Sequence, residues 1–306
     1  MDFTFLRKTR FFLLFLLMVI FFSAINVKAN WEKDLFSYLQ SLEGERLENN
    51  YLLAFYTGIG KCSDNFLTKN LYIKDQQTFA PIFNLWIEYG FKRYDNTLKL
   101  KNYYLQNGER VFFGNSSSHF KPDNWEFNGQ TIDSWKFGLS TTKGIGIRLF
   151  ENYAIEFQNQ NSLVWNRIDF EYFFKKNIID PVIQRFDEKY RFGSDYSAAI
   201  IIPVTSNFSL DVQYQRNLIF PEWKFSKWFG SYILENGARH CFDYFDQDLF
   251  DAIGSDYYLY KFLYQAAVSF LFTELKRGQT FTPFNSSESL LMQYINIRFT
   301  FVKQNN

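Results

Sequence analysis

The stretch that decides the fold is Tyr196–Phe220, YSAAIIIPVTSNFSLDVQYQRNLIF. Two runs of alternating apolar and other residues meet in it at Thr205-Ser206-Asn207. The shared face carries Tyr196, Ala198, Ile200, Ile202 and Val204 before these residues, and Phe208, Leu210, Val212 and Tyr214 after them. A period of two is typical of a strand with one apolar face. Thr-Ser-Asn favours a turn, because Asn tolerates positive φ. The stretch therefore predicts a β-hairpin.

A similar hairpin is predicted 55 residues earlier, when Asn152 is aligned with Asn207. Gln158 and Gln160 then fall on Gln213 and Gln215. Alternation also predicts strands elsewhere, at Tyr51–Ile59, Ile82–Phe91, 98–107, Trp135–Leu149, Tyr258–Phe272 and Leu291–Val302, with a short segment at Gln279–Phe284. The total is about ten strands, within a range of eight to twelve. The recurring unit is either an internal repeat or the convergence of alternating strands with Asn turns.

Residues 1–29 read as a cleavable signal peptide. Arg7, Lys8 and Arg10 form a basic start, an apolar core follows, and Val27-Lys28-Ala29 resembles a cleavage site, so we predict cleavage after Ala29. Residues 30–50 are expected to form a separate N-terminal segment with a short amphipathic helix, and residues 51–306 a single domain built from the strands. The mature chain has 29 Lys and Arg against 31 Asp and Glu, which does not favour a nucleic-acid partner.

The hydrophobicity of the chain is dispersed by alternation. Aromatic residues make up 22% of the sequence, yet no internal run reaches the roughly 18 apolar residues of a transmembrane helix. Tyr153 and Trp165, like Phe208 and Phe220, lie twelve positions apart on one face. Twelve residues of a tilted strand span roughly 30 Å, close to the spacing of two aromatic girdles. The opposite faces are polar, which suits a barrel with lipid outside.

This signal, the hairpin pattern and the alternating last strand resemble the bacterial outer-membrane β-barrels as a class. The resemblance implies an antiparallel up-and-down transmembrane barrel over residues 51–306 in the cell outer membrane, with residues 30–50 as an N-terminal periplasmic or plug segment. It also implies the lipid bilayer and the barrel-insertion machinery as partners. The end of the chain departs from the class, which usually ends on an aromatic residue. Here Phe301 is followed by Val302-Lys303-Gln304-Asn305-Asn306.

The resemblance also implies a topology. The short turns at Asn96, Asn152 and Asn207 face the periplasm, and the long loops face outward. Cys62 and Cys241 then lie on the same side, which permits a disulfide, although both thiols could equally remain reduced. The two Cys and two His show no metal-ligand spacing, so we predict no metal and no cofactor.

The polar inner face favours a narrow porin-like channel or solute-uptake protein for small polar solutes. We expect these residues on that face: Asn84, Glu88, Lys99, Lys101, Lys136, Arg148, Glu156, Gln158, Gln160, Asp211, Gln213, Gln215, Lys261 and Arg298. At eight to ten strands, however, side chains alone can fill the interior. The alternative is therefore a closed barrel that serves as a surface-exposed binding or structural protein, favoured by its long aromatic loops.

A barrel-embedded hydrolase is the third reading. It needs a His close to a Ser or Asp at the rim. His240 with Asp243 is the best candidate, and His119 follows Ser116-Ser117-Ser118. Neither arrangement matches a hydrolase motif, so the chain is not expected to be an enzyme.

Overall fold

The protein has 306 residues. Its computed structural model describes residues 50–63, 80–95, 103–119, 131–150, 153–171, 183–205, 207–241, 250 and 253–303.

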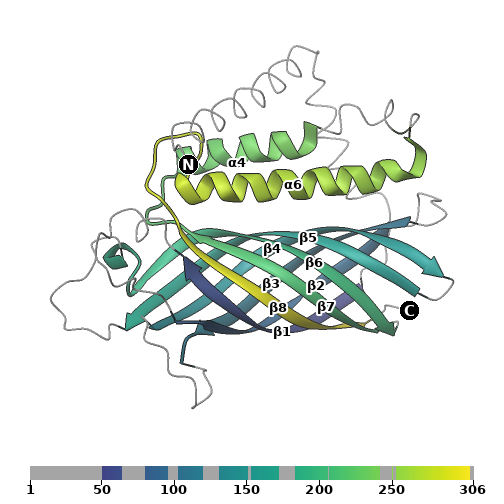
Figure 1. The fold of residues 1–306 in the computed structure, drawn as a ribbon, viewed down its shortest axis with the longest axis horizontal. Coiled ribbons are helices and arrows are strands. Elements are labelled where there is room, and N and C mark those ends of the chain that lie inside the picture. Colours follow the sequence, from purple (N-terminus) through teal and green to yellow (C-terminus); the bar gives the residue numbers. More distant parts are fainter. Residues whose placement is uncertain are drawn as a thin grey trace, which may run out of the picture. The chain divides into compact units, whose positions relative to one another are not determined.

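Eight antiparallel strands close into one barrel in sequential order, as Figure 1 shows. Their bounds are β1 Asn50–Ser63, β2 Ile82–Asp95, β3 Tyr103–Ser117, β4 Thr131–Phe150, β5 Tyr153–Glu171, β6 Lys189–Thr205, β7 Phe208–Ile219 and β8 Leu290–Lys303. The barrel closes where β1 pairs with β8, in a register that runs from Tyr51 opposite Lys303 to Ser63 opposite Leu291. The hairpin at Asn207 is confirmed, because β6 and β7 are joined through residues 206–207 and pair along their length.

The connections fall at two different ends of the barrel. With sequential antiparallel pairing, the strand ends that flank residues 96–102, 151–152 and 206–207 lie at one end, which we call the turn end. The first residue of β1 and the last residue of β8 lie at this end too. The other connections, including the one of 70 residues between Ile219 and Leu290, leave from the opposite end, which we call the loop end.

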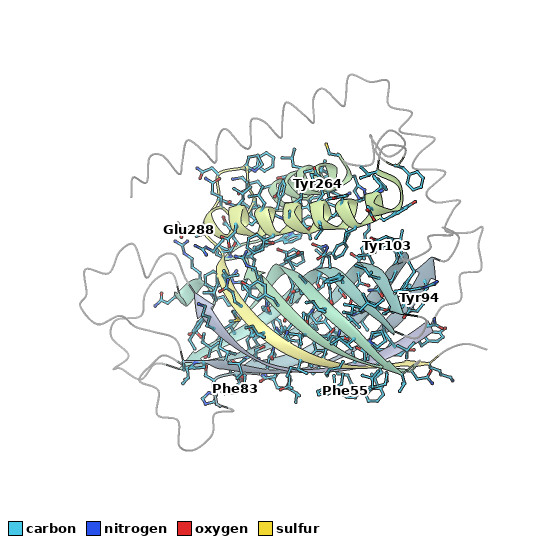
Figure 2. The ribbon with its side chains drawn as sticks, turned by 45° about the vertical axis from the view of Figure 1, so that its right-hand side comes forward. Phe55, Phe83, Tyr94, Tyr103, Tyr264 and Glu288 are labelled. Atoms are coloured by element: carbon cyan, nitrogen blue, oxygen red, sulfur yellow. The ribbon has the colours of Figure 1, made fainter. Side chains whose placement is uncertain are left out.

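The barrel has apolar side chains outside and polar side chains inside. In β8, Ile295, Ile297 and Phe299 are exposed, whereas Asn296 and Arg298 between them are buried. Phe55 likewise lies on the outer surface (Figure 2). A soluble barrel buries its apolar face, whereas a transmembrane barrel turns that face to lipid. The fold that the resemblance implies is thus confirmed: the chain forms a closed antiparallel barrel with its apolar face outside, the arrangement of transmembrane barrels.

The number of strands is eight rather than about ten, because one predicted strand is a helix and another forms turns. The predicted strand Tyr258–Phe272 lies in α6, Tyr257–Gly278. This segment is apolar at almost every position, so alternation cannot distinguish strand from helix. Its polar positions carry the better signal, because Lys261, Gln265, Ser269 and Thr273 are spaced by four. The short predicted segment Gln279–Phe284 forms turns.

The third strand lies later in the chain than the alternation predicts. We predicted a strand at 98–107 followed by a loop from Asn115, but β3 runs from Tyr103 to Ser117. Its alternation is hidden in the sequence because Asn107 and Glu109 face outward near the turn end, opposite the buried Gln106 and Arg110. Both faces of the strand therefore read as polar.

The chain forms two compact units, and the division falls within two helices. The unit Glu48–Ser231 with Ser269–Asn306 holds the whole barrel, the start of α4 (Phe225–His240) and the end of α6. The described part of the second unit lies within Tyr232–Val268, where Tyr264 donates a hydrogen bond of 2.8 Å to the carbonyl of Ala238. Short 3-10 helices occur at Ile183–Arg185 and Gly254–Asp256.

Across the described ranges, we find no helix that is long and apolar enough to cross a membrane. Residues 30–49 of the predicted N-terminal segment, with its helix, lie outside the described residues, as does the signal peptide, and Asn50 begins β1.

Candidate functional site: the barrel interior

The candidate site is the inside of the barrel, where side chains from strands that are not neighbours meet. Arg298 on β8 contacts Gln158 on β5, and Gln160 on β5 contacts Glu88 on β2. Such contacts must cross the interior, because these strands are not adjacent in the sheet. The sequence predicted many of these polar side chains on one face, and the structure brings them together in one buried network.

Arg298 is the centre of this network and is only 1% exposed. Its guanidinium forms an ion pair with Asp211 on the adjacent β7. It also donates hydrogen bonds of 2.8 Å to the Tyr56 hydroxyl and 2.6 Å to Gln158 Oε1. A rigid fork with several donors suits such a role, because it can satisfy acceptors on several strands at once. One side chain thus ties β8 to β7, β1 and β5.

Glu88 on β2 is the second centre. Its Oε2 lies 3.1 Å from Arg110 Nη1 and 3.6 Å from Arg298 Nη1, and it accepts a hydrogen bond from the Tyr56 hydroxyl. Its Oε1 accepts a bond of 3.0 Å from Gln160. We call the set Tyr56, Glu88, Arg110, Gln158, Gln160, Asp211 and Arg298 the central network. Each of its charges has a partner of opposite sign, which a buried ion requires in a medium of low dielectric.

A second ion pair crosses the interior nearer the turn end. Lys92 Nζ on β2 lies 2.6 Å from Glu156 Oε2 on β5, and both side chains are buried. The other oxygen of Glu156 accepts a bond of 2.7 Å from the Tyr104 hydroxyl on β3. We call Lys92, Tyr104 and Glu156 the turn-end layer. Lys92 lies four positions after Glu88 on the same face of β2, so this layer is the next one along the barrel.

On the loop-end side of the central network, the ammonium group of Lys136 packs against aromatic rings. Lys136 Nζ on β4 lies 3.0 Å from the ring centre of Trp86 and 4.4 Å from that of Tyr294. The Trp86 ring stacks on Phe112, with 5.4 Å between centroids. Cation–π contacts of this kind stabilise a desolvated ammonium. On the same side of the network, Asn296 on β8 donates a bond of 2.8 Å to Gln215, which in turn donates one of 2.5 Å to Asp195.

Apolar side chains close the interior at the loop end. They form one buried cluster, which we call the apolar cap: Cys62, Ile82, Ile132, Ile168, Phe170, Phe186, Ile219, Leu290, Met292 and Tyr294. Nine of these residues come from strands, near their loop ends, and Phe186 comes from the connection between β5 and β6. An apolar layer this tightly buried excludes water from that end of the lumen.

The buried charges of the described interior balance in sign. The acidic members are Glu88, Glu156, Asp195 and Asp211, and the basic members are Lys92, Arg110, Lys136 and Arg298. A balanced set does not favour passage of ions of one sign. The burial of these groups also means that they contact other side chains of the barrel rather than a water-filled path. The arrangement can therefore hold a barrel shut and rigid.

The structure places the predicted interior residues as follows. Glu156, Gln158, Asp211, Gln213, Gln215 and Arg298 are all buried and bonded to side chains of other strands. Arg148 is different, because it is exposed near the turn end, with its guanidinium 5.8 Å from the centre of the Tyr104 ring. Lys99 and Lys101 lie outside the described residues. Lys261 was wrongly placed, because it lies in α6.

Sequence reasoning missed Tyr56, Lys92, Arg110 and Asp195. Lys92 and Arg110 lie just beyond the predicted ends of their strands, so the face of each was not assigned. Tyr56 shares its face of β1 with the apolar residues Leu52 and Ala54, so nothing in the sequence marks that face as polar. A continued alternation through Glu88, Gly90 and Lys92 was the available signal for β2.

The cysteines and histidines of the sequence remain outside this network. Cys62 lies in the apolar cap and Cys241 is buried directly after α4, so the disulfide between them stays a prediction. His119 is exposed at the loop end, and its backbone N–H donates a bond of 3.1 Å to Ser117 Oγ. His240 ends α4, but Asp243 lies outside the described residues. Within those residues, no three His, Cys, Asp or Glu side chains gather as a metal site requires.

Comparisons with known proteins add little to this picture. No protein-family model and no curated protein matches the chain. Among solved structures, Neisserial surface protein A is 10% identical, with 82% of this chain and 96% of that chain covered and a TM-score of 0.37. The attachment invasion locus protein of Yersinia pestis is also 10% identical, with coverages of 83% and 100% and a TM-score of 0.28. An outer membrane channel from Pseudomonas putida F1 is 7% identical, with coverages of 85% and 97% and a TM-score of 0.25. These values are too low to carry a conclusion about what this chain does.

Proposed function

We propose that this chain is a bacterial outer-membrane protein whose barrel is closed by its own side chains. In this proposal the barrel is a rigid anchor, and the protein acts through its loop end as a surface-exposed binding or structural element. The observation that carries the proposal is Arg298, which is almost fully buried and joins β8 to its neighbours β7 and β1 and, across the interior, to β5.

The polarity of the wall supports a place in a membrane. Large apolar side chains such as Leu85, Phe113 and Ile295 are more than half exposed on the outer face. Contact of this apolar outer wall with water would cost free energy all around the barrel, whereas contact with lipid would not. The predicted signal peptide supports export, so we place the turn end in the periplasm and the loop end outside the cell. We also propose the insertion machinery of such barrels as a partner during assembly.

A narrow channel for small polar solutes is the other reading of the polar interior. A conducting lumen needs lining groups that water can reach along its whole length. Here the polar groups Glu88, Gln158 and Arg298 are at most 2% exposed, and the apolar cap lies on the loop-end side of them. The burial of the network favours the closed barrel, because eight strands leave an interior that side chains can fill.

Conductance in planar lipid bilayers distinguishes the two readings. The purified protein is first shown to be folded by a gel shift between heated and unheated samples. We expect the folded protein to insert and to give no single-channel steps at any salt concentration. Regular conductance steps from the wild-type protein would overturn the closed barrel and support the channel.

Location is tested separately from conductance. We expect the chain in the outer-membrane fraction of the cell, with Asn30 as its first residue by mass spectrometry. A chain recovered in the soluble periplasmic fraction would refute the proposed location.

A further inference from the structure

Exposed aromatic rings gather where the chain leaves β7 and begins α4. Trp223, Phe225 and Phe229 are 47%, 60% and 46% exposed, and Trp228 is half-buried beside them. We call Trp223, Phe225, Trp228 and Phe229 the aromatic foot. Its rings contact one another, with 5.1 Å between Trp223 and Trp228 and 5.8 Å between Phe225 and Phe229. Exposed apolar side chains in contact with each other usually mark a surface that binds a partner or lipid.

The foot continues the apolar outer face of the barrel. The ring of Trp223 lies 4.0 Å from that of Phe192 on β6, and Phe192 lies 5.4 Å from Trp165 on β5. Trp165 in turn stacks on Phe137 of β4 at 5.5 Å, and Phe137 is exposed. A row of touching rings thus runs from the outer wall of β4 to the first turns of α4. The three strand residues lie in the loop-end halves of their strands, so the row runs around the outer wall on that side of the barrel.

The foot is fixed to the barrel rather than loosely attached. Phe220 directly follows β7 and is buried against Phe281, with 5.5 Å between the ring centroids. Lys227 donates a hydrogen bond of 2.5 Å from Nζ to the carbonyl of Asn285, just before β8. All of these residues belong to the unit that contains the barrel. The height of the foot on the barrel is therefore set by β6, β7 and the start of β8.

The chemistry of the foot suits the headgroup region of a membrane. Trp and Tyr prefer this region because one part of the ring system is apolar and another can hydrogen-bond. Two lysines, Lys224 and Lys227, lie among the rings, and Lys224 forms an exposed ion pair of 2.7 Å with Glu222. The first turn of α4 carries no acidic residue. The local excess of positive charge complements phosphate groups of anionic lipids.

We propose that the aromatic foot inserts into the headgroup and upper acyl region of the outer leaflet, next to the barrel. The foot extends the lipid-contacting surface from the strands onto a helix of the last loop. The inference rests on the proposed membrane location of the barrel. Its occupant is an anionic lipid surface, because the foot is continuous with the wall that faces lipid and carries lysines among its rings.

Quenching of tryptophan fluorescence by brominated lipids tests this proposal. The full mature chain is reconstituted into phosphatidylcholine vesicles with phosphatidylglycerol, in which the acyl chains carry bromine near the headgroup. Wild type is compared with Trp223→Phe and with Trp135→Phe, since Trp135 is 45% exposed on the outer wall of β4. We expect each substitution to remove part of the quenchable emission. Trp86→Phe is the matched control and should leave quenching unchanged, because Trp86 is 4% exposed inside the barrel.

The two tryptophans separate the failure of this inference from the failure of the proposed function. If Trp135 is quenched and Trp223 is not, the barrel lies in lipid but the foot faces water or a protein, and the inference is overturned. If neither is quenched in folded protein, the barrel itself is not embedded, and both proposals fail. If the double variant Lys224→Glu, Lys227→Glu shows weaker quenching of Trp223 than wild type, the result supports anionic lipid as the partner of the foot.

Discussion

At the scale of single residues, Arg298 has the largest expected effect on stability. Its replacement by Met removes the partner of Asp211 and one of the two cations beside Glu88. Breaking a buried ion pair from one side costs about 3–5 kcal/mol, because it leaves an uncompensated buried charge. We therefore expect Arg298→Met to lower the free energy of unfolding by about this amount. Urea unfolding of the barrel in detergent micelles, followed by tryptophan fluorescence, measures the change.

Two controls show whether the loss comes from an unpaired buried charge. In the double variant Arg298→Met, Asp211→Leu, both members of the pair are apolar, and we expect much of the stability to return. Arg167→Met tests an exposed pair, since Arg167 Nε lies 3.6 Å from Asp169 and both side chains are more than a third exposed. Surface pairs contribute about 0–1 kcal/mol, so this variant should be nearly neutral. Equal losses for Arg167→Met and Arg298→Met would contradict the assigned role.

At the scale of elements, one ion pair fixes the end of α6 to the outside of β7. Arg216 lies on the side of β7 opposite Gln215 and Asn217, yet it is fully buried. Its guanidinium pairs with Glu274 and lies 4.8 Å from the centre of the Phe270 ring. An arginine on the outer wall of such a barrel would be costly in contact with lipid. This part of the wall is therefore covered by the protein itself.

Glu274→Gln is expected to loosen this contact while leaving the barrel intact. The substitution removes the carboxylate that neutralises Arg216, so amide hydrogens of Ser269–Gly278 should exchange faster with deuterium. The strands β1 to β5 should keep their protection. Arg277→Gln is the matched control, because Arg277 lies 3.6 Å from Glu274 at a partly exposed position and should change little. Unchanged exchange in Glu274→Gln would show that packing alone holds the end of α6.

The hairpin around Asn207 shows why most of the strands were predictable and α6 was not. A strand between lipid and a polar interior must alternate, so its sequence records its two faces directly. In the part of α6 that was predicted as a strand, Tyr258–Phe272, almost every side chain is apolar, and the only contrast is the spacing of four between Lys261, Gln265 and Ser269. The strand β3 lies between these cases, because Asn107 and Glu109 make its outer face polar near the turn end.

The sequence predicts which strand faces point into the barrel, but not which side chains meet there. Alternation placed Glu156, Asp211 and Arg298 on polar faces. It could not show that Glu156 meets Lys92, because β5 and β2 are not adjacent and their contact depends on the curvature of the closed sheet. The number of strands decides this geometry, since each added strand widens the barrel and separates opposite walls. With eight strands rather than about ten, opposite walls lie closer together, and side chains such as Glu156 and Lys92 can meet across the interior.

At the scale of the whole molecule, the interior is blocked by layers in series. From the loop end of β2 to its turn end, Ile82 belongs to the apolar cap, Glu88 to the central network and Lys92 to the turn-end layer. A pore conducts only if every constriction along it is open. No single layer should therefore act as the gate of this barrel.

Conductance of layer variants tests this arrangement. We expect no conductance from a cap variant with Phe170, Phe186 and Met292 changed to Ala, because the central network still crosses the lumen. Variants with Ser at Glu88, Gln158 and Arg298 alone, or at Lys92 and Glu156 alone, should also be silent. The variant that combines all three sets with Trp86→Ala and Lys136→Ser, which also opens the layer between the cap and the central network, should give single-channel steps in planar bilayers, provided that it shows the gel shift of a folded barrel. Steps from any one-layer variant would identify that layer as the sole barrier and contradict the closed, serially blocked interior.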